Sequence, residues 1–191
     1  MKRLFLLGVS ILLAAGLFGQ EFKLGSRVGD FTIYDLKGNP VQLSSLKGDV
    51  TVIMFIATQC PVSNAYNERM KAVYNDYSAK GVRFVFMNAN RTEPAAEVEQ
   101  HAAQHGFPFK VYKDNNNVVA DRFGAQVTPE TFVLDGTSTI LYHGYIDDSQ
   151  NPAGIKLQGL RLALDAVLAG RAVERTETKA FGCAIKRARS L

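Results

Sequence analysis

Residues 50–70 read Val-Thr-Val-Ile-Met-Phe-Ile-Ala-Thr-Gln-Cys-Pro-Val-Ser-Asn-Ala-Tyr-Asn-Glu-Arg-Met. The run from Val50 to Ala57 is almost entirely apolar and rich in β-branched side chains, which is typical of a central strand buried on both faces. Pro61 suits the first turn of a helix, where its missing N–H is no loss, and the residues after it alternate as a helix requires. Cys60 is therefore predicted to lie where a buried strand becomes a helix.

A cysteine at the start of a helix is favoured as a thiolate. The first backbone N–H groups of a helix lack internal partners, and the helix dipole adds partial positive charge beside the sulfur. A free cysteine is also among the most frequently buried residues and packs as a small hydrophobe. The position of Cys60 by itself leaves both a reactive thiol and an inert one open.

A second motif lies at residues 127–135, which read Val-Thr-Pro-Glu-Thr-Phe-Val-Leu-Asp. Pro129 stands directly before another apolar strand, where an X-Pro bond can adopt the cis form and carry a turn against a neighbouring site. Taken alone, this motif also fits an ordinary proline at the start of a strand.

Together the two segments resemble the thioredoxin-like superfamily, in particular its redoxin branch of AhpC/TSA, peroxiredoxin-like and TlpA-like exported proteins. The segment Cys60-Pro61-Val62-Ser63 stands where that family has Cys-x-x-Cys, and Thr128-Pro129 stands where it has a cis-proline loop. The resemblance covers residues 28–168 and implies an α/β fold, with a central mixed β-sheet flanked by helices and an N-terminal β-hairpin extension.

The remaining segments predict the elements of such a fold. A hairpin is expected around the turn at residues 37–40, and the serines after it indicate a short helical turn. Strands are predicted at 82–88 and 107–112, helices at 93–105, 115–123 and 157–168, and a second hairpin at 131–134 and 140–145. Pro94 is expected in the first turn of its helix and Gly124 at a helix end. Strands separated by helices imply parallel pairing.

The N-terminus has the pattern of a secretory signal peptide. Lys2 and Arg3 precede an apolar run from Leu4 to Phe18 with small residues near its end. This run of about 15 residues is short for a membrane span, which needs about 20; an uncleaved anchor is the alternative. We expect a signal peptide at 1–20, a redoxin domain at 21–170 and a basic tail at 171–191, in an exported protein that is periplasmic or extracellular after cleavage.

The charge balance does not indicate nucleic acid as a partner. The formal net charge is +4 for the 191 residues, and it falls to +2 without Lys2 and Arg3. A membrane partner is expected only if the N-terminal segment stays uncleaved.

The tail contains the second of the two cysteines, within Phe181-Gly182-Cys183-Ala184-Ile185-Lys186. A basic tail is by default solvated, but two cysteines in an exported chain are suspected of pairing. Phe181 and Ile185 could dock the tail on the domain. Similar exported redoxin-like proteins carry Gly-Cys-x-Ile-Lys near the C-terminus, and this resemblance implies a tail cysteine that returns to the active site.

The resemblance implies a thiol-disulfide oxidoreductase or thiol-dependent peroxidase without a cofactor. The Cys60 thiolate would attack a peroxide or a disulfide, Cys183 would be the resolving thiol, and an external thiol would reduce the product. Ser63, in the place of the second family cysteine, would donate its hydroxyl to the Cys60 sulfur. Pro129 would shape the groove, and Thr58 or Arg91 would bind an oxygen species. The peroxiredoxin pattern Pro-x-x-x-Thr/Ser-x-x-Cys is not matched, because Ile53 and Ala57 occupy its proline and hydroxyl positions.

Two other functions stay open at this level. A non-catalytic binding module would use Cys60 and Cys183 as a structural disulfide. A copper-handling protein like the Sco relatives of this fold would use both sulfurs and His143 as soft ligands. His101 and His105 lie one turn apart, and we expect them on a solvated helix face rather than at a metal.

Overall fold

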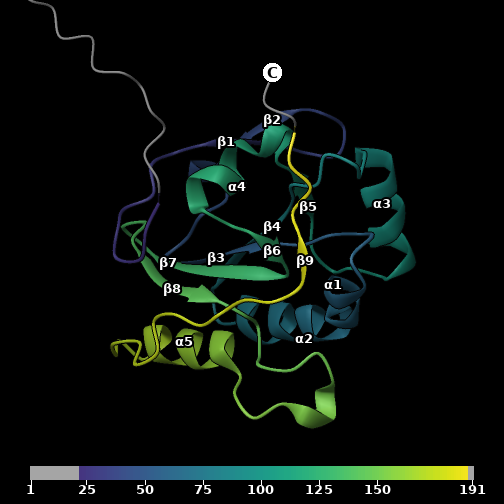
Figure 1. Ribbon diagram of the computed structural model, residues 1–191. Helices are drawn as coiled ribbons and strands as arrows, with labels where there is room; N and C mark the ends of the chain where they lie inside the picture. Colours follow the sequence, from purple (N-terminus) through teal and green to yellow (C-terminus); the bar gives the residue numbers. More distant parts are fainter. Residues whose placement is uncertain (1–21, 189–191) are drawn as a thin grey trace, which may run out of the picture.

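The computed structural model describes residues 22–188. Their main feature is a mixed β-sheet with helices on both sides (Figure 1). The seven-stranded sheet has the order β2-β1-β5-β4-β3-β7-β8, and a two-stranded sheet pairs β6 with β9. The strands are β1 (Thr32–Tyr34), β2 (Pro40–Gln42), β3 (Val50–Phe55), β4 (Arg83–Asn88), β5 (Val111–Lys113), β6 (Val127–Thr128), β7 (Glu130–Asp135), β8 (Ile140–Gly144) and β9 (Cys183–Ala184). The helices are α1 (Pro61–Ala65), α2 (Asn67–Ser78), α3 (Ala95–Gln104), α4 (Val118–Phe123) and α5 (Gly159–Leu168), with short 3₁₀ turns at Leu43–Ser45, Asn115–Asn117 and Pro152–Gly154.

The central strand β3 is buried along its whole length, as its apolar sequence predicts. It pairs in parallel with β4 and antiparallel with β7, and β4 pairs in parallel with β5. The mixed α/β sheet and the parallel pairing across the helical connections are thereby confirmed.

The two faces of the sheet carry separate apolar cores. Side chains alternate along a strand, so Ile53 and Phe55 join the core that α4 covers, while Val52 and Met54 join the core that α2 and α5 cover. Figure 1 shows α4 on one side of the sheet and α2 and α5 on the other. The chain leaves the C-terminal end of β3 at Phe55 and reaches Cys60 through residues 56–59.

The N-terminal hairpin is confirmed. β1 and β2 pair antiparallel around the turn, where the Asp35 carboxylate accepts hydrogen bonds from the backbone N–H groups of Lys37 and Asn39. No helix within residues 22–188 is long and apolar enough to cross a bilayer. The expected signal peptide at 1–20 lies outside the described residues.

The helix after Cys60 differs from the prediction of one continuous helix. It consists of a five-residue α1 and a twelve-residue α2, with Tyr66 between them. Tyr66 is buried, and its hydroxyl donates to the Asp147 carboxylate at 2.9 Å, which fixes the chain at the junction. The helix α3 begins at Ala95, so Pro94 is its N-cap residue and not part of its first turn as expected.

The C-terminal segment returns across the molecule (Figure 1). After α5 it runs beside β8, where the backbones of Thr176 and Thr178 hydrogen-bond to His143, and it then pairs with β6 through β9. Phe181 packs against Tyr66, and Ile185 is buried in the core on the α4 side. The expected docking through Phe181 and Ile185 is confirmed, and a fully solvated tail is excluded for residues 171–188.

Candidate active site

Cys60 lies in the loop after β3 as the N-cap residue of α1, and only 3% of its surface is exposed. The backbone N–H of Ser63 donates to its sulfur at 3.2 Å, and the thiol donates to the Thr128 carbonyl oxygen at 3.4 Å. The prediction that the Ser63 hydroxyl contacts the sulfur is wrong. That hydroxyl turns into the protein and accepts from the N–H of Ala57 at 3.1 Å, because a buried backbone donor needs a partner there.

Pro129 follows the residue that touches the thiol, and the Thr128–Pro129 peptide bond is cis. Thr128 also belongs to β6, where it pairs with Cys183 of β9. The strand before Pro129 therefore contacts both cysteines.

The structure brings Cys183 to Cys60, as the resemblance implies. Both are free thiols, and Thr128 joins them: its carbonyl oxygen accepts from the Cys60 thiol, and the same residue pairs with Cys183 between β6 and β9. Cys183 is partly exposed, whereas Cys60 is buried.

The pKa values of the two thiols are shifted in opposite directions. Burial raises the pKa of Cys60, but hydrogen bonds from the Cys183 thiol and the Ser63 N–H outweigh it, so this pKa lies below the ordinary value of a thiol. The hydrogen bond to Cys60 and partial burial raise the pKa of Cys183. This arrangement favours a thiolate on Cys60 with a protonated Cys183 beside it.

A buried carboxylate holds the loop that leads to Cys60. Glu93 is 1% exposed, and its side chain accepts from the backbone N–H groups of Thr58 at 2.7 Å and Gln59 at 3.1 Å. The Asn90 amide donates to the same carboxylate at 2.7 Å. These hydrogen bonds outweigh burial and lower the pKa of Glu93, so the group is an anion.

A buried lysine lies under this network. Lys113 Nζ donates to the backbone carbonyls of Asn90 and Glu93 and to the side-chain oxygen of Asn88 at 2.6 Å. Burial lowers its pKa, and the Glu93 carboxylate acts in the opposite direction. Its three oxygen acceptors match the three N–H bonds of an ammonium group.

Thr58 and Arg91 both have hydrogen-bond partners other than Cys60, and their expected role at an oxygen species stays a prediction. The Thr58 hydroxyl donates to Glu97 at 2.7 Å, and Arg91 Nε donates to the backbone carbonyl of Arg187. Among residues 22–188, neither side chain has a hydrogen bond to Cys60. Carboxylate and carbonyl acceptors on neighbouring elements hold these donors instead.

His143 is placed beside the cis-proline segment. Its Nε2 lies 2.6 Å from the carboxylate of buried Glu130, which also accepts from the backbone N–H groups of Gln126 and Val127. Its ring stacks on Phe132, and its Nδ1 lies 3.7 Å from Glu177. Residues 22–188 contain no cluster of three His, Cys, Asp or Glu side chains suited to a metal.

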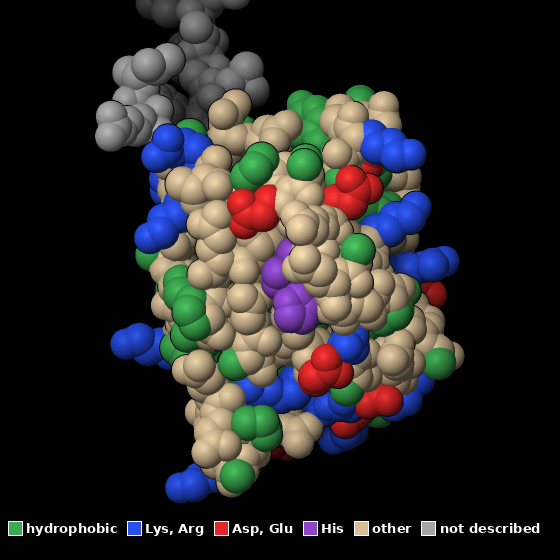
Figure 2. All heavy atoms as spheres, turned by 90° about the vertical axis from the view of Figure 1, so that its right-hand side faces the viewer, with side chains coloured by type: hydrophobic (Ala, Val, Ile, Leu, Met, Phe, Trp, Pro, Cys, Tyr) green, Lys and Arg blue, Asp and Glu red, His purple; other side chains and the backbone are tan. Residues whose placement is uncertain are grey.

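The prediction of a solvated helix face is right for His105 and wrong for His101. Figure 2 shows histidine side chains together on the face that includes α3, where the two ring centroids lie 4.3 Å apart. His101 is half-buried because its Nε2 bonds to Asn64 Oδ1 at 2.8 Å, and the Asn64 amide donates to the Thr58 carbonyl. His101 thus supports α1 next to Cys60.

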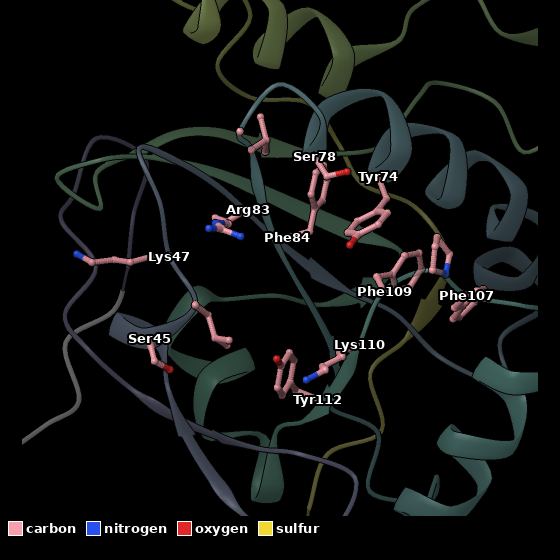
Figure 3. A pocket seen from close by; sticks show the side chains of 14 residues that line it. Ser45, Lys47, Tyr74, Ser78, Arg83, Phe84, Phe107, Phe109, Lys110 and Tyr112 are labelled. Carbon is pink, nitrogen blue, oxygen red and sulfur yellow. The ribbon is translucent and has the colours of Figure 1, made fainter.

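A hollow of about 800 Å³ lies elsewhere on the molecule (Figure 3). Aromatic side chains of Tyr74, Phe84 and Phe109 line it, together with Lys47 and Arg83. It lies by the N-terminal ends of β4 and β5, whereas Cys60 follows the C-terminal end of β3, parallel to β4. Neither cysteine lines this hollow.

Residues 24–143 match the model of the AhpC/TSA family. The chain belongs to this family. The matched segment contains Cys60 and Pro129 and ends before the tail with Cys183. The redoxin resemblance drawn from the sequence is thereby confirmed.

Curated relatives of this AhpC/TSA protein include two thiol-disulfide oxidoreductases named ResA. The chain is 27% identical over 113 residues to that of Halalkalibacterium halodurans and 30% identical over 112 residues to that of Geobacillus kaustophilus. Each match covers 59% of this chain and 63% of the relative, so the chain spans less than two thirds of the length of these relatives.

Solved structures resemble the AhpC/TSA protein over more of its length. An uncharacterized conserved protein from Geobacillus kaustophilus has a TM-score of 0.82 at 34% identity. The match covers 89% of this chain and 95% of that protein. A hypothetical protein from Sinorhizobium meliloti has a TM-score of 0.79 at 30% identity, with 90% and 98% covered. A thiol:disulfide interchange protein DsbE from Chlorobium tepidum, 23% identical with a TM-score of 0.65 over 78% of this chain and 99% of its own, shares the thioredoxin-like fold.

Sequence reasoning missed Glu93, Asn90 and Glu130. Asn90 and Glu93 follow the end of a buried strand, and Glu130 is a charge inside an apolar strand directly after Pro129. Polar residues at the ends of buried strands were the available signal, since buried charges need partners.

Proposed function

We propose that this protein is a thiol-disulfide oxidoreductase in which Cys60 is the attacking thiolate and Cys183 the resolving thiol. The observation that supports this most is that the two free thiols meet at Thr128, whose carbonyl oxygen accepts from the buried Cys60 thiol and which pairs with Cys183 between β6 and β9. The lowered pKa of Cys60 agrees with this role. In the first step the Cys60 thiolate attacks one sulfur of a disulfide, and the other sulfur leaves as a thiolate that takes up a proton. The Cys183 thiol then loses its proton and attacks Cys60, so a Cys60–Cys183 disulfide forms and a second thiol leaves.

We favour disulfide over peroxide as the oxidant. A peroxide reaction needs donors that stabilise the attacked oxygen, and the side chains of Thr58 and Arg91 are bonded to other partners. The names of the ResA relatives agree with disulfide exchange. An external thiol would reverse both steps and reduce the protein again. Export after removal of residues 1–20 is part of the proposal, since disulfides persist outside the cytosol.

The test is the redox behaviour of the Cys60–Cys183 pair. The reduced full chain is treated with glutathione disulfide, and separately with hydrogen peroxide, and mass spectrometry follows the loss of two hydrogen atoms. The Cys183→Ser variant is expected to stop at a glutathione adduct on Cys60, whereas wild type closes the internal disulfide.

The reduction potential separates this proposal from a structural disulfide. A potential well above about −300 mV in a glutathione series is expected for a working couple. A reduction potential below about −300 mV, or a Cys60 that reacts with neither oxidant, would favour the non-catalytic binding module. Either result would overturn the proposed oxidoreductase function.

A further inference from the structure

The edge of the strand next to Cys60 is already occupied by the chain itself. β6 pairs antiparallel with β9, with Val127 opposite Ala184 and Thr128 opposite Cys183. Extended polypeptides commonly bind by adding a strand to an open edge. Because Thr128 also accepts the Cys60 thiol, a polypeptide that presented its disulfide to Cys60 along this edge would compete with β9.

The tail approaches this edge so closely that only glycine fits. Gly182 has φ +153°, and a Cβ atom there would overlap the carbonyl oxygen of Thr128. The tail backbone therefore lies directly on the cis-proline segment and leaves no space for another strand between them.

The tail is also bound on both sides of β9. Upstream, the Phe181 ring contacts the Tyr66 ring, with centroids 6.2 Å apart. Downstream, the buried Ile185 donates its N–H to the Gln126 carbonyl at 2.9 Å, and the Lys186 N–H donates to Asn90 Oδ1 at 2.7 Å.

The last described residues extend this attachment. Arg187 Nε lies 3.0 Å from the Asp121 carboxylate, and the Ala188 N–H donates to Asn117 Oδ1 at 2.6 Å. Displacing β9 therefore breaks a series of contacts that extends over residues 181–188.

We propose that β9 is a built-in competitor for extended polypeptides, so that Cys60 exchanges with small disulfides and reacts with polypeptide disulfides only when residues 181–188 detach. This inference rests on the proposed reactivity of Cys60 and names the substrate class of that site. A small disulfide forms no strand pairing, so it needs only local access to the Cys60 sulfur beside the partly exposed Cys183. A polypeptide reacts at a rate set by the population of the detached state. In the exchange with a small disulfide, the two protein thiols become one protein disulfide, and the small disulfide becomes two small thiols.

The experiment uses the full chain with Cys183→Ser, in which Cys60 is the only thiol. Two reagents carry the same reactive bond: cysteine, and an extended decapeptide with one cysteine, each as the mixed disulfide with nitrothiobenzoate. Release of the coloured nitrothiobenzoate gives both rate constants. The cysteine reagent is expected to react at least about 100-fold faster than the peptide reagent, since detachment is a minor state.

Two further substitutions on this background alter the tail. Gly182→Ala forces β9 off Thr128, and Arg187→Ala removes the contacts with the Asp121 carboxylate and the Ala125 carbonyl oxygen without touching β9. Each is expected to lower the rate ratio at least about tenfold by raising the detached population. Gly170→Ala is the matched control, because Gly170 has φ +67° with no atom within 4 Å of an added Cβ.

The outcomes separate the two proposals. Similar rates for both reagents on the intact tail, or an unchanged ratio in both tail variants, would overturn the competitor role of β9. No reaction with either reagent would overturn the proposed function, because Cys60 itself would then be unreactive.

Discussion

At the scale of single residues, the acidity of Cys60 depends on the donors around its sulfur. The Ser63 N–H and the Cys183 thiol both lower the pKa of Cys60 against the effect of burial. The Ser63 donor belongs to α1, while Cys183 comes from the tail. Acidity of Cys60 is therefore coupled to the presence of residue 183.

Cys183→Ser and Cys183→Ala should give different pH profiles for alkylation of Cys60. The serine hydroxyl still donates to the sulfur, whereas alanine donates nothing, so the thiolate should appear at lower pH in the serine variant. The measurement is the rate of carboxymethylation against pH, with Cys60 as the only thiol in both proteins. Identical midpoints would show that residue 183 does not influence the acidity of Cys60.

Glu93→Gln should destabilise the protein by about 3 kcal/mol. The carboxylate accepts two donors on each oxygen, from the N–H groups of Thr58 and Gln59 and the amides of Asn88 and Asn90, so an amide NH₂ leaves two of the four donors facing another donor. The substitution also deprives buried Lys113 of its nearby anion. Urea unfolding of the reduced protein measures this difference. Glu99→Gln, at an exposed position of α3, is the control and should change stability by less than about 0.5 kcal/mol. A Glu93→Gln variant as stable as this control would contradict the role of Glu93 in holding the loop.

At the scale of elements, the short helix α1 is held by its neighbours rather than by its own length. It has five residues, and an isolated helix of that length is unstable in water. His101 of α3 bonds to Asn64 of α1, and Asn64 bonds to the Thr58 carbonyl. α3 thus supports the turn that carries Cys60.

This link predicts a pH dependence of stability. Burial and the neighbouring His105 lower the pKa of His101 below its ordinary value of 6.5. Below that pH the unfolded chain binds more protons, so the contribution of His101 is complete above about pH 6.5 and falls as the pH drops towards the folded pKa. His101→Gln keeps a donor for Asn64 without titrating. Urea unfolding at about pH 7.5 and 5.5 should show a smaller loss for the variant than for wild type. Equal losses would contradict this prediction.

At the scale of the whole molecule, the tail joins both cores to the candidate active site. Phe181 packs with the core on the α2 and α5 side, and Ile185 packs with the core on the α4 side. Cys183 lies between them in sequence and is held by the pairing of β9 with β6. The position of the second thiol is therefore part of the global packing.

Closing the Cys60–Cys183 disulfide should stabilise the protein by less than the about 4 to 5 kcal/mol that closing a loop of this length can give, because a disulfide that is readily reduced gains little stability from folding. The measurement is the difference in unfolding free energy between the oxidised and reduced proteins, with Cys183→Ser treated in the same way as control. A destabilised oxidised form would mean that the described arrangement of the thiols does not lead to the disulfide.

The sequence by itself determined the architecture of this protein, together with the identity of its two thiols and its cis-proline motif. Apolar runs such as Val50–Ala57 are local patterns, and local patterns specify strands and helices wherever the chain places them. Their order was enough to indicate the redoxin family.

Only the tertiary structure decided how those residues are used. Ser63 contacts the sulfur through its backbone, Thr58 faces Glu97, and Glu93 anchors the loop before Cys60. These contacts join segments that are distant in sequence, and each buried polar group takes the partner that packing brings within hydrogen-bond distance. The tail is a further example. Its basic composition predicts a solvated segment, but the burial of Ile185 and the close fit of Gly182 against Thr128 hold Cys183 next to Cys60.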